Sequence, residues 1–325
     1  MNLLITGAAG FIGSHFVRTA LDDGYPELAG ARITAMDKLT YSGNRVNIPA
    51  DGPRLTFVLG DICDRELLRQ VLPGHDAIVH FAAETHVDRS IEGAGEFFRT
   101  NVLGTYTLLD TALNCGIERM VHISTDEVYG SITEGSWTEQ QPLLPNSPYA
   151  ASKAGSDLAA RAYWHTHQLD VRITRCSNNY GPYQHPEKLI PLFMTNLLEG
   201  RPVPIYGDGS NVREWIHVDD HCRAVYLVLT RGRSGEVYNV GGGVEQTNLA
   251  VTERLLELCG ADRSAIRMVP DRKGHDLRYS IDETKIREEL GYEPRIPFER
   301  GLADTFAWYR DNPGWWKATK QATYQ

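Results

Sequence analysis

The segment TGAAGFIG, Thr6–Gly13, decides the fold of this chain. It follows an apolar run at the N-terminus and precedes a stretch of helical character, so it predicts a turn from a first strand into a first helix. Gly7, Gly10 and Gly13 permit a tight turn, a close approach of the backbone to a ligand, and close packing of helix on strand. Because backbone N–H groups are unpaired at a helix N-terminus, the segment predicts a binding site for the pyrophosphate of a dinucleotide. The spacing is GxxGxxG.

Strand-like and helix-like segments alternate through the first half of the chain. The predicted strands are Leu3–Thr6, Ile33–Asp37, Thr56–Leu59, Ala77–Phe81, Met120–Ser124 and Val171–Arg175. The predicted helices between them are Ser14–Asp22, Arg65–Leu72, Phe97–Cys115 and Tyr149–His167. This alternation predicts an α/β fold of the Rossmann type, a doubly wound parallel sheet with helices on both faces.

The pattern loosens after about Tyr180, where several prolines interrupt the chain. The predicted elements there are a helix at Leu189–Glu199, a strand at Glu236–Val240 and helices at Val251–Cys259 and Thr284–Leu290. We expect residues 1–180 to bind the dinucleotide, with the chain returning to the sheet at about 212–243. Residues 181–325 are expected to form mainly a smaller C-terminal substrate-binding region. The tail after Trp308 receives no assignment.

The composition is that of an ordinary globular protein, with 42% hydrophobic and 23% charged residues in a chain of 325. A net charge of −9 argues against a nucleic-acid partner, which would need a basic face. No apolar run approaches the roughly 20 residues that span a bilayer. The first residues, MNLLITGAAG, show no basic region or cleavage site, so export is not expected. Five widely spaced cysteines are expected to be reduced thiols, which favours a cytoplasmic location.

Two aspartates follow predicted strands and extend the cofactor prediction. Asp37 ends the second strand, twenty-four residues past Gly13. A carboxylate there can accept hydrogen bonds from ribose hydroxyls and repel a 2′-phosphate, which favours NAD over NADP. The alternative is a turn or helix-capping aspartate. Asp61 follows the third strand and is expected either to bind the adenine or to be a turn residue.

The stretch HISTDEVYG, His122–Gly130, carries adjacent carboxylates at Asp126 and Glu127 where a buried strand ends. Like charges repel, and partial burial strengthens the repulsion, so the pair predicts a chemical role. Consecutive strand residues point to opposite faces, so both carboxylates could not reach one ligand from a regular strand. We therefore predict that the strand ends by Thr125 and that the backbone turns helically at Asp126. One carboxyl can then keep a proton while the other ionises.

PNSPYAASK places Tyr149 and Lys153 four residues apart near a helix start set by Pro148. This spacing puts both side chains on one helix face. A lysine ammonium beside a phenol stabilises the phenolate, so the tyrosine can act as a base near neutral pH.

Together these motifs resemble the extended short-chain dehydrogenase/reductase family of nucleotide-sugar enzymes. Within it, HFAAETHVDRSI, STDEVYG, SPYAASKAGSD, RCSNNYGPYQHPEKLIP and REWIHVDDHCRA are similar to the 4,6-dehydratases. The likeness runs from Met1 to about Leu302. It implies an NAD-dependent hydro-lyase that removes water from a nucleotide sugar, with dTDP-glucose as the expected substrate.

The resemblance also implies roles for the catalytic residues. Tyr149, supported by Lys153, would take the proton of the sugar C4 hydroxyl as C4 gives its hydride to NAD⁺. Thr125 would hydrogen-bond the C4 oxygen, Glu127 would act as the base at C5, and Asp126 would be the acid at the C6 oxygen. Hydride return to C6 makes the reaction redox-neutral.

Binding residues are carried over where the motifs match. Those expected around NAD are Gly7, Gly10, Phe11, Ile12, Gly13, Asp37, Lys38, Leu39, Thr40, Asp61, Ile62, Phe81, Ala82, Ala83, Thr85, Thr100, Tyr149, Lys153 and Asn179. Those expected around the nucleotide sugar are Thr85, Thr125, Asn178, Lys188, Leu189, Pro204, Ile205, Tyr206, Arg213, Asn248, Arg272, His275 and Tyr279. A bidentate guanidinium suits a diphosphate, so Arg213 and Arg272 are the expected phosphate ligands. The family often has proline where Lys273 stands, which leaves the shape of that loop open.

No metal site is expected. In HVDDH, His217 is predicted to close a strand and Asp219 to cap the next helix. Other functions left open are a UDP-glucose 4,6-dehydratase, a 4-epimerase or a UDP-glucuronate decarboxylase on the same scaffold, and a non-catalytic NAD-sensing protein. A sensor would be expected to lose Tyr149, Lys153 or the carboxylates.

The helices predicted at 97–115 and 149–167 carry apolar residues on more than one face, and the resemblance implies a homodimer formed through them. The residues concerned are Val102, Leu103, Tyr106, Leu109 and Leu113 in the first helix, and Leu158, Ala159, Ala162 and Tyr163 in the second. The alternative is that the substrate-binding region covers the second apolar stripe.

Overall fold

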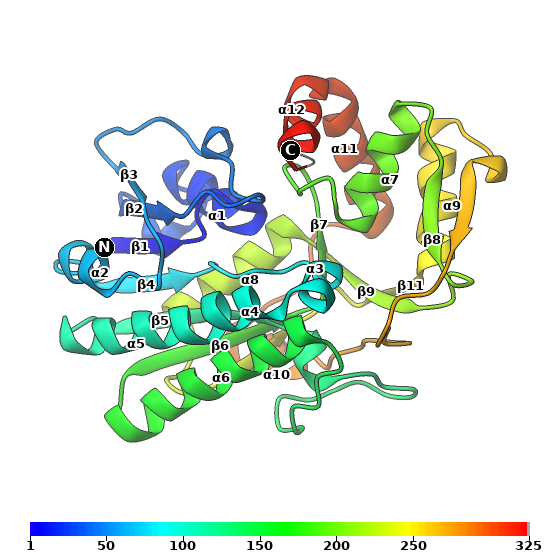
Figure 1. Cartoon of the computed structure of the whole chain (residues 1–325). Helices are drawn as coiled ribbons and strands as arrows, with labels where there is room; N and C mark the ends of the chain where they lie inside the picture. Colours follow the sequence, from blue (N-terminus) through cyan, green and yellow to red (C-terminus); the bar gives the residue numbers. More distant parts are fainter. Residues whose placement is uncertain (324–325) are drawn as a thin grey trace.

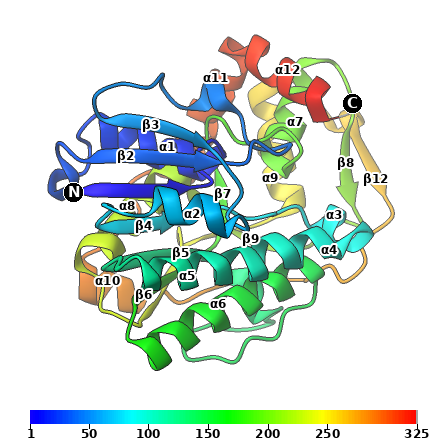
Figure 2. The same ribbon diagram turned by 60° about the vertical axis from the view of Figure 1, so that its left-hand side comes forward.

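A seven-stranded parallel sheet forms the centre of the computed structural model, which describes residues 1–323, so the last two residues of the predicted substrate-binding region lie outside it. Its order is β10-β6-β5-β4-β1-β2-β3 (Figures 1 and 2). The order β3-β2-β1-β4-β5-β6 is that of dinucleotide-binding sheets, which confirms the predicted fold class. The strands are β1 (Asn2–Thr6), β2 (Arg32–Asp37), β3 (Leu55–Leu59), β4 (Ala77–His80), β5 (Arg119–Thr125), β6 (Asp170–Cys176) and β10 (Val237–Val240).

Helices cover both faces of this sheet, which is why its central strands are largely buried, including the polar side chains His80, His122 and Ser124. One face packs against α1 (Phe11–Leu21), α8 (Val218–Arg231) and α10 (Thr284–Leu290). The other face packs against α2 (Arg65–Val71), α5 (Thr105–Asn114) and α6 (Pro148–His167). The carboxyl ends of the strands stay free of helices and face the second part of the molecule (Figure 2).

The second part carries two small sheets and its own apolar core. One sheet pairs β7 (Asn178–Tyr180), β9 (Val212–His217) and β11 (Val244–Thr247), and the other pairs β8 (Val203–Tyr206) with β12 (Ile266–Val269). Its helices are α7 (Leu189–Leu198), α9 (Asn248–Cys259), α11 (Phe298–Asp311) and α12 (Pro313–Thr323). Figure 1 shows these elements gathered beyond the end of the large sheet.

Strand β10 rejoins the large sheet beside β6, within the range 212–243 expected for the return, whereas β9 pairs with β7 and β11. One predicted helix differs from the structure. The helix predicted at Phe97–Cys115 is interrupted: α4 (Ala94–Phe97) leads into a π-helical stretch, Phe98–Gly104, before α5 begins. Inside that stretch the Asn101 side chain bonds both the N–H and the carbonyl of Glu84, at 2.9 and 3.0 Å.

The HVDDH motif is partly as predicted. His217 ends β9, but it also caps α8 itself, because its ring accepts a hydrogen bond from the Asp219 N–H at 3.2 Å. Asp219 lies in the first helical turn and contacts His15 at 3.1 Å, so the prediction of an Asp219 cap is wrong. Within residues 1–323, no group of three or more His, Cys, Asp or Glu side chains is arranged to hold a metal. Among the described helices, none is both long enough and apolar enough to cross a bilayer.

Candidate active site

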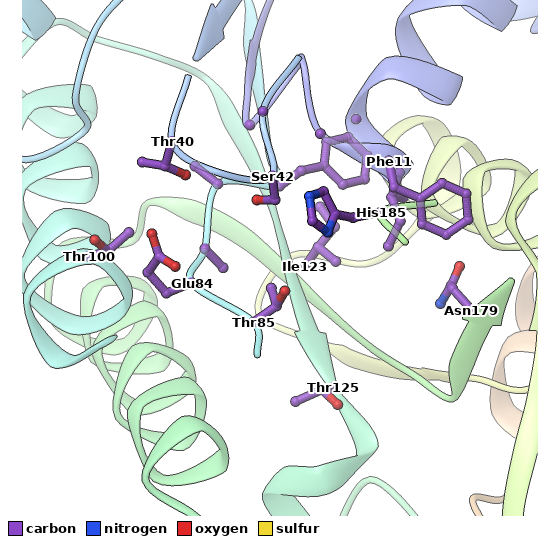
Figure 3. A pocket seen from close by; sticks show the side chains of 18 of the residues that line it. Phe11, Thr40, Ser42, Glu84, Thr85, Thr100, Ile123, Thr125, Asn179 and His185 are labelled. Atoms are coloured by element: carbon purple, nitrogen blue, oxygen red, sulfur yellow. The ribbon is translucent and has the colours of Figure 1, made fainter. Parts of the chain in front are cut away.

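Two connected cavities lie at the carboxyl ends of the large sheet. The first, of about 280 Å³, runs past the ends of β1, β2, β4 and β5 (Figure 3). The second, of about 820 Å³, lies between the large sheet and the second part of the molecule. Both are lined by Thr85, Glu127, Asn178, Glu187 and Lys188, so the cavities meet at these residues.

The predicted cofactor residues gather around the first cavity with one exception. Leu39 does not line it, because its side chain points to solvent and only its N–H turns inward, to Asp37 Oδ1 at 2.7 Å. The lining residues among those predicted are Gly7, Gly10, Phe11, Ile12, Gly13, Asp37, Lys38, Thr40, Asp61, Ile62, Phe81, Ala82, Ala83, Thr85, Thr100, Tyr149, Lys153 and Asn179.

The glycine turn leaves no room for side chains. Gly7 has φ +67°, and a Cβ there would lie 2.5 Å from the Ala82 nitrogen. A Cβ on Gly13 would lie 2.2 Å from the Gly7 oxygen, so helix α1 packs directly on the turn. Among the described residues, no side chain caps α1, so its first N–H groups remain available to a ligand at the cavity wall. A pyrophosphate fits this cradle.

Asp37 sits at the end of β2 with 8% of its surface exposed. Its Oδ2 accepts a hydrogen bond from the Ala9 N–H at 2.9 Å, which ties the carboxylate to the glycine turn. Burial raises the pKa of Asp37, and the backbone N–H groups that it accepts from oppose the rise. Beside it, Lys38 and Asp61 form an ion pair at 2.8 Å. Both aspartates line the first cavity.

The segment that carries the two adjacent carboxylates has the predicted shape. Strand β5 ends at Thr125, and a 3₁₀ turn runs over Asp126–Tyr129, which confirms the helical turn at Asp126. Thr125 caps this turn: its hydroxyl accepts from the Glu127 N–H at 3.3 Å and donates to Asp126 Oδ1 at 3.2 Å. Asp126 lines the first cavity alone, whereas Glu127 lines both.

The two carboxyls differ in their surroundings. Asp126 is only 2% exposed, and burial, Glu127 and Glu214 raise its pKa well above the usual range. Burial also raises the pKa of Glu127, but three cations, Arg213, Lys188 and Arg272, oppose that rise. Asp126 is therefore the better proton donor of the pair and Glu127 the better base.

Helix α6 brings Tyr149 and Lys153 to the same cavity. It starts at Pro148, with the Ser147 hydroxyl accepting from the Ala150 N–H at 3.1 Å. Burial lowers the pKa of Lys153 to about 8, and Asp157 opposes this. Its ammonium donates to the Ile123 carbonyl at 2.8 Å.

The phenol of Tyr149 meets opposing influences. Its pKa is raised well above the usual range by burial and by Glu127, while a hydrogen bond with Thr125 lowers it. Tyr149, Thr125 and Lys153 therefore meet beside the two carboxyls, at the end of the cofactor cavity.

The predicted nucleotide-sugar residues line the second cavity, except Thr125, which lines the first. Arg213 is held by the carbonyls of Val212 and Asp276, at 2.7 and 2.9 Å, and its guanidinium lies over the Tyr279 ring. Arg272 pairs with Asp88 at 2.6 Å. The remaining predicted residues around this cavity are Thr85, Asn178, Lys188, Leu189, Pro204, Ile205, Tyr206, Asn248 and His275.

Several lining residues were not predicted. In the first cavity they include Ser42, Gly43, Glu84, Gln184, His185 and Glu187, and in the second His86, Asp88, Arg89 and Trp215. Most lie inside motifs that already signal the family, HFAAETHVDRSI, RCSNNYGPYQHPEKLIP and REWIHVDDHCRA. Arg89, in the first of these motifs, contacts Glu187 of the second at 3.3 Å. Its guanidinium also lies 3.9 Å from the centre of the Tyr41 ring, which lies outside the motifs.

Comparison with known proteins matches this geometry to a family. The family model described as GDP-mannose 4,6 dehydratase matches residues 4–305. The chain belongs to this family. A dTDP-glucose 4,6-dehydratase of Streptomyces niveus is 59% identical over 322 residues, which cover 98% of this chain and 96% of that protein.

Solved structures of family relatives superpose closely. DesIV of Streptomyces venezuelae, a dTDP-glucose 4,6-dehydratase crystallised with NAD bound, has a TM-score of 0.97 at 64% identity, covering 98% of this chain and 100% of that chain. A UDP-glucose 4-epimerase of Thermotoga maritima, solved with UDP-glucose, has a TM-score of 0.88 at 31% identity, covering 96% of this chain and 100% of that one. The resemblance inferred from the motifs is confirmed.

Proposed function

We propose that this chain is a dTDP-glucose 4,6-dehydratase that converts dTDP-glucose to dTDP-4-keto-6-deoxyglucose and water. The observation that carries the proposal is the pair Asp126–Glu127 beside Tyr149 in the first cavity, with Glu127 also lining the second cavity. Elimination of water needs one proton donor and one base close together, and the two carboxyls supply them.

The first step is proton removal at C4. Tyr149 takes the proton of the C4 hydroxyl, Lys153 supports the phenolate, and Thr125 holds the C4 oxygen. NAD, when bound, supplies the hydride acceptor for C4 and returns the same hydride to C6. The glycine turn and Asp37 hold this cofactor through its pyrophosphate and its adenosine ribose, so that one molecule serves many turnovers.

The second step is elimination. The 4-ketone acidifies the C5 hydrogen, and Glu127 removes it as a base and returns a proton to C5 when the hydride is added at C6. Asp126, whose pKa is the more strongly raised of the two, gives its proton to the C6 oxygen as water leaves. In a regular strand, the side chains of Asp126 and Glu127 would point to opposite faces of the sheet. The helical turn at Asp126 allows both carboxyls to reach the sugar, at different positions.

The substrate occupies the second cavity in this proposal. Arg213 and Arg272 bind the diphosphate, and the remaining predicted residues surround the nucleotide and the sugar. We assign cofactor binding mainly to residues 1–180, with the chain returning to that domain at about 212–243, and substrate binding mainly to residues 181–325.

The same scaffold also carries UDP-glucose 4-epimerases, so the fold alone does not decide the reaction. The acid–base pair favours the dehydratase over an epimerase, which needs no group to expel water. Retention of Tyr149 and Lys153 in one cavity with both carboxyls disfavours a non-catalytic NAD sensor.

We further propose that the enzyme is a cytoplasmic homodimer. Leu103 and Leu158 are 50% and 57% exposed on neighbouring helices, and Tyr106 is also exposed, so the substrate-binding region does not cover these three side chains. Such an apolar face fits the same face of a second copy. Leu109, in contrast, is buried in the core of the monomer. All five cysteines are free thiols, as expected in a reducing compartment.

The test uses dTDP-glucose labelled with deuterium at C4, incubated with the purified protein without added NAD. We expect a product lighter by one water that carries the deuterium at C6, and no such product from UDP-glucose at equal concentration. Deuterium retained at C4 would identify an epimerase, and deuterium lost to solvent would contradict internal hydride return.

A further inference from the structure

The C-terminal segment Trp308–Trp316 joins α11 to α12 and lies outside both cavities. Its inner side belongs to the core of the second part, where Trp316 is 2% exposed and its indole N–H donates to the Tyr309 carbonyl at 2.8 Å. Its outer side, at Trp315, meets Asn47 of the first part. The segment therefore contacts both halves of the molecule.

One contact leads to the glycine turn. The Trp315 indole N–H donates to Asn47 Oδ1 at 2.8 Å, and Asn47 Nδ2 donates to the Ala9 carbonyl at 2.9 Å. Ala9 in turn donates its N–H to Asp37 at 2.9 Å. Because Asn47 is only 3% exposed, water does not readily replace either bond of its side chain. A hydrogen-bonded line thus runs from the tail to the turn that cradles the pyrophosphate.

A second contact leads to the turn after β7. The rings of Trp308 and Trp315 pack on Tyr183, with centroids 4.5 and 5.7 Å apart, and the Arg18 guanidinium lies 4.2 Å from the centre of the same ring. Tyr183 has φ +69°, a conformation that favours glycine and that a bulky residue keeps only when its surroundings hold it. The tail supplies two of those supports. The next residue, Gln184, lines the cofactor cavity, and its carbonyl accepts from the Tyr309 hydroxyl.

The two segments that the tail holds meet across the cofactor cavity. Thr40, Ser42 and Gly43 line it from one side, and Gln184 and His185 from the other. The segments touch where the rings of Tyr41 and His185 meet edge-on, with their centroids 5.6 Å apart.

We propose that Trp308–Trp316 is a tail clamp that retains the dinucleotide by holding the 40–47 loop and the 181–185 turn together. The inference rests on the proposed function in one respect, that the cofactor is NAD. A reaction that returns its hydride to the same sugar requires a cofactor that does not leave between the two steps. The clamp meets that requirement from outside the site, with no contact to the reacting atoms. Trp315 is accordingly a positioning residue.

The test compares NAD release from Trp315→Phe and from wild type. Phenylalanine keeps an aromatic ring against Tyr183 but cannot donate to Asn47, which leaves a buried acceptor unpaired. We expect about tenfold faster release of NAD from the folded variant, measured by dilution into a competing dinucleotide analogue. The rate of C4 oxidation in the molecules that still hold cofactor should match wild type. Trp316→Phe is the matched control, because it removes an equivalent indole bond that stays within the tail.

A double variant separates the hydrogen-bonded line from general loosening of the tail. If the line carries the effect, adding Trp315→Phe to Asn47→Ala changes the release rate no further. An equal acceleration in both backgrounds, or equal release from Trp316→Phe and Trp315→Phe, would overturn the clamp. So would unchanged release from Trp315→Phe. A wild-type protein that holds no NAD would instead contradict the proposed function.

Discussion

The two cavities are built in different ways. The cofactor cavity is formed mostly where strands β1, β2, β4 and β5 end, so neighbouring strands fix its residues and short motifs encode it. The substrate cavity is assembled from α3 (Val87–Glu92), α7, β8, β9 and the loop around Arg272, which lie far apart in the sequence. A site at the carboxyl ends of neighbouring strands tolerates few substitutions. In a site made of separate segments, single contact residues can be substituted one at a time.

The catalytic residues of the cofactor cavity should show the largest effects. Tyr149→Phe keeps the ring but removes the base, so C4 oxidation should fall by about 10²–10⁴-fold. Rapid mixing of enzyme and substrate, followed through the absorbance of reduced nicotinamide, measures this step. Lys153→Ala should also be severe, because the phenolate loses its cation.

Tyr163→Phe is the matched control for Tyr149→Phe. It lies on the same helix, its hydroxyl donates to Asp110 at 3.1 Å, and it lines neither cavity. It should behave as wild type. Normal C4 oxidation by Tyr149→Phe would show that another group is the base.

Substitution of the two carboxyls should distinguish elimination from C4 oxidation. Asp126→Asn and Glu127→Gln keep the side-chain shapes but remove the acid and the base, so elimination should slow by about 10²-fold. C4 oxidation should continue, and reduced nicotinamide should accumulate when substrate is added. If both variants instead lose C4 oxidation and accumulate nothing, the pair serves substrate binding and not elimination.

Sequence reasoning succeeded where function depends on a local segment. The glycine turn, the end of β2 at Asp37 and the helical turn at Asp126 each follow from residues that are neighbours in the chain. The adjacent charges of Asp126 and Glu127 even predicted the backbone geometry, because a regular strand could not present both.

It failed where a contact joins distant segments. The ion pair between Arg272 and Asp88 crosses 184 residues, and no local pattern announces it. The apolar residues of the π-helical stretch Phe98–Gly104 are spaced as in an ordinary α-helix, so the sequence does not distinguish the two. The stretch is held by a distant contact, in which the Asn101 side chain bonds the backbone of Glu84. The tail after Trp308 gave no signal because its partners, Asn47 and Tyr183, precede it by more than a hundred residues.

Substitutions in the substrate cavity should have weaker effects than those of the catalytic residues. Arg272→Lys keeps the charge but loses the planar pair of donors, so KM for dTDP-glucose should rise about tenfold while kcat changes little. The pairing with Asp88 sharpens the expectation, since the diphosphate must compete with that carboxylate. Lys273→Ala, next to it and exposed, is the control and should leave KM unchanged. A fall in kcat with unchanged KM would place Arg272 in the chemistry rather than in binding.

The smallest effect should come from substitution of Asp157, which lies behind the wall of the cofactor cavity. Asp157 is buried one helical turn after Lys153, where it pairs with Arg175 at 2.9 Å and contacts His122 at 3.3 Å. Its carboxylate raises the pKa of Lys153 against the effect of burial, and the result is about 8. The ammonium is the supporting form, so activity should fall as pH rises through about 8.

In Asp157→Asn the carboxylate that favours the ammonium is gone, and the unpaired Arg175 disfavours it further, so Lys153 loses its proton at lower pH. The alkaline limb of kcat/KM should therefore move down by about one pH unit, while activity near neutral pH changes little. Asp110→Asn is the control, because it also breaks an aspartate–arginine pair, with Arg65, but lines neither cavity. A limb that stays in place in a folded Asp157→Asn protein would show that this network does not set the charge of Lys153. A limb that moves upward would reverse the sign of its influence. An unmoved limb would confine control of the catalytic pair to the cavity itself, where neighbouring residues encode it.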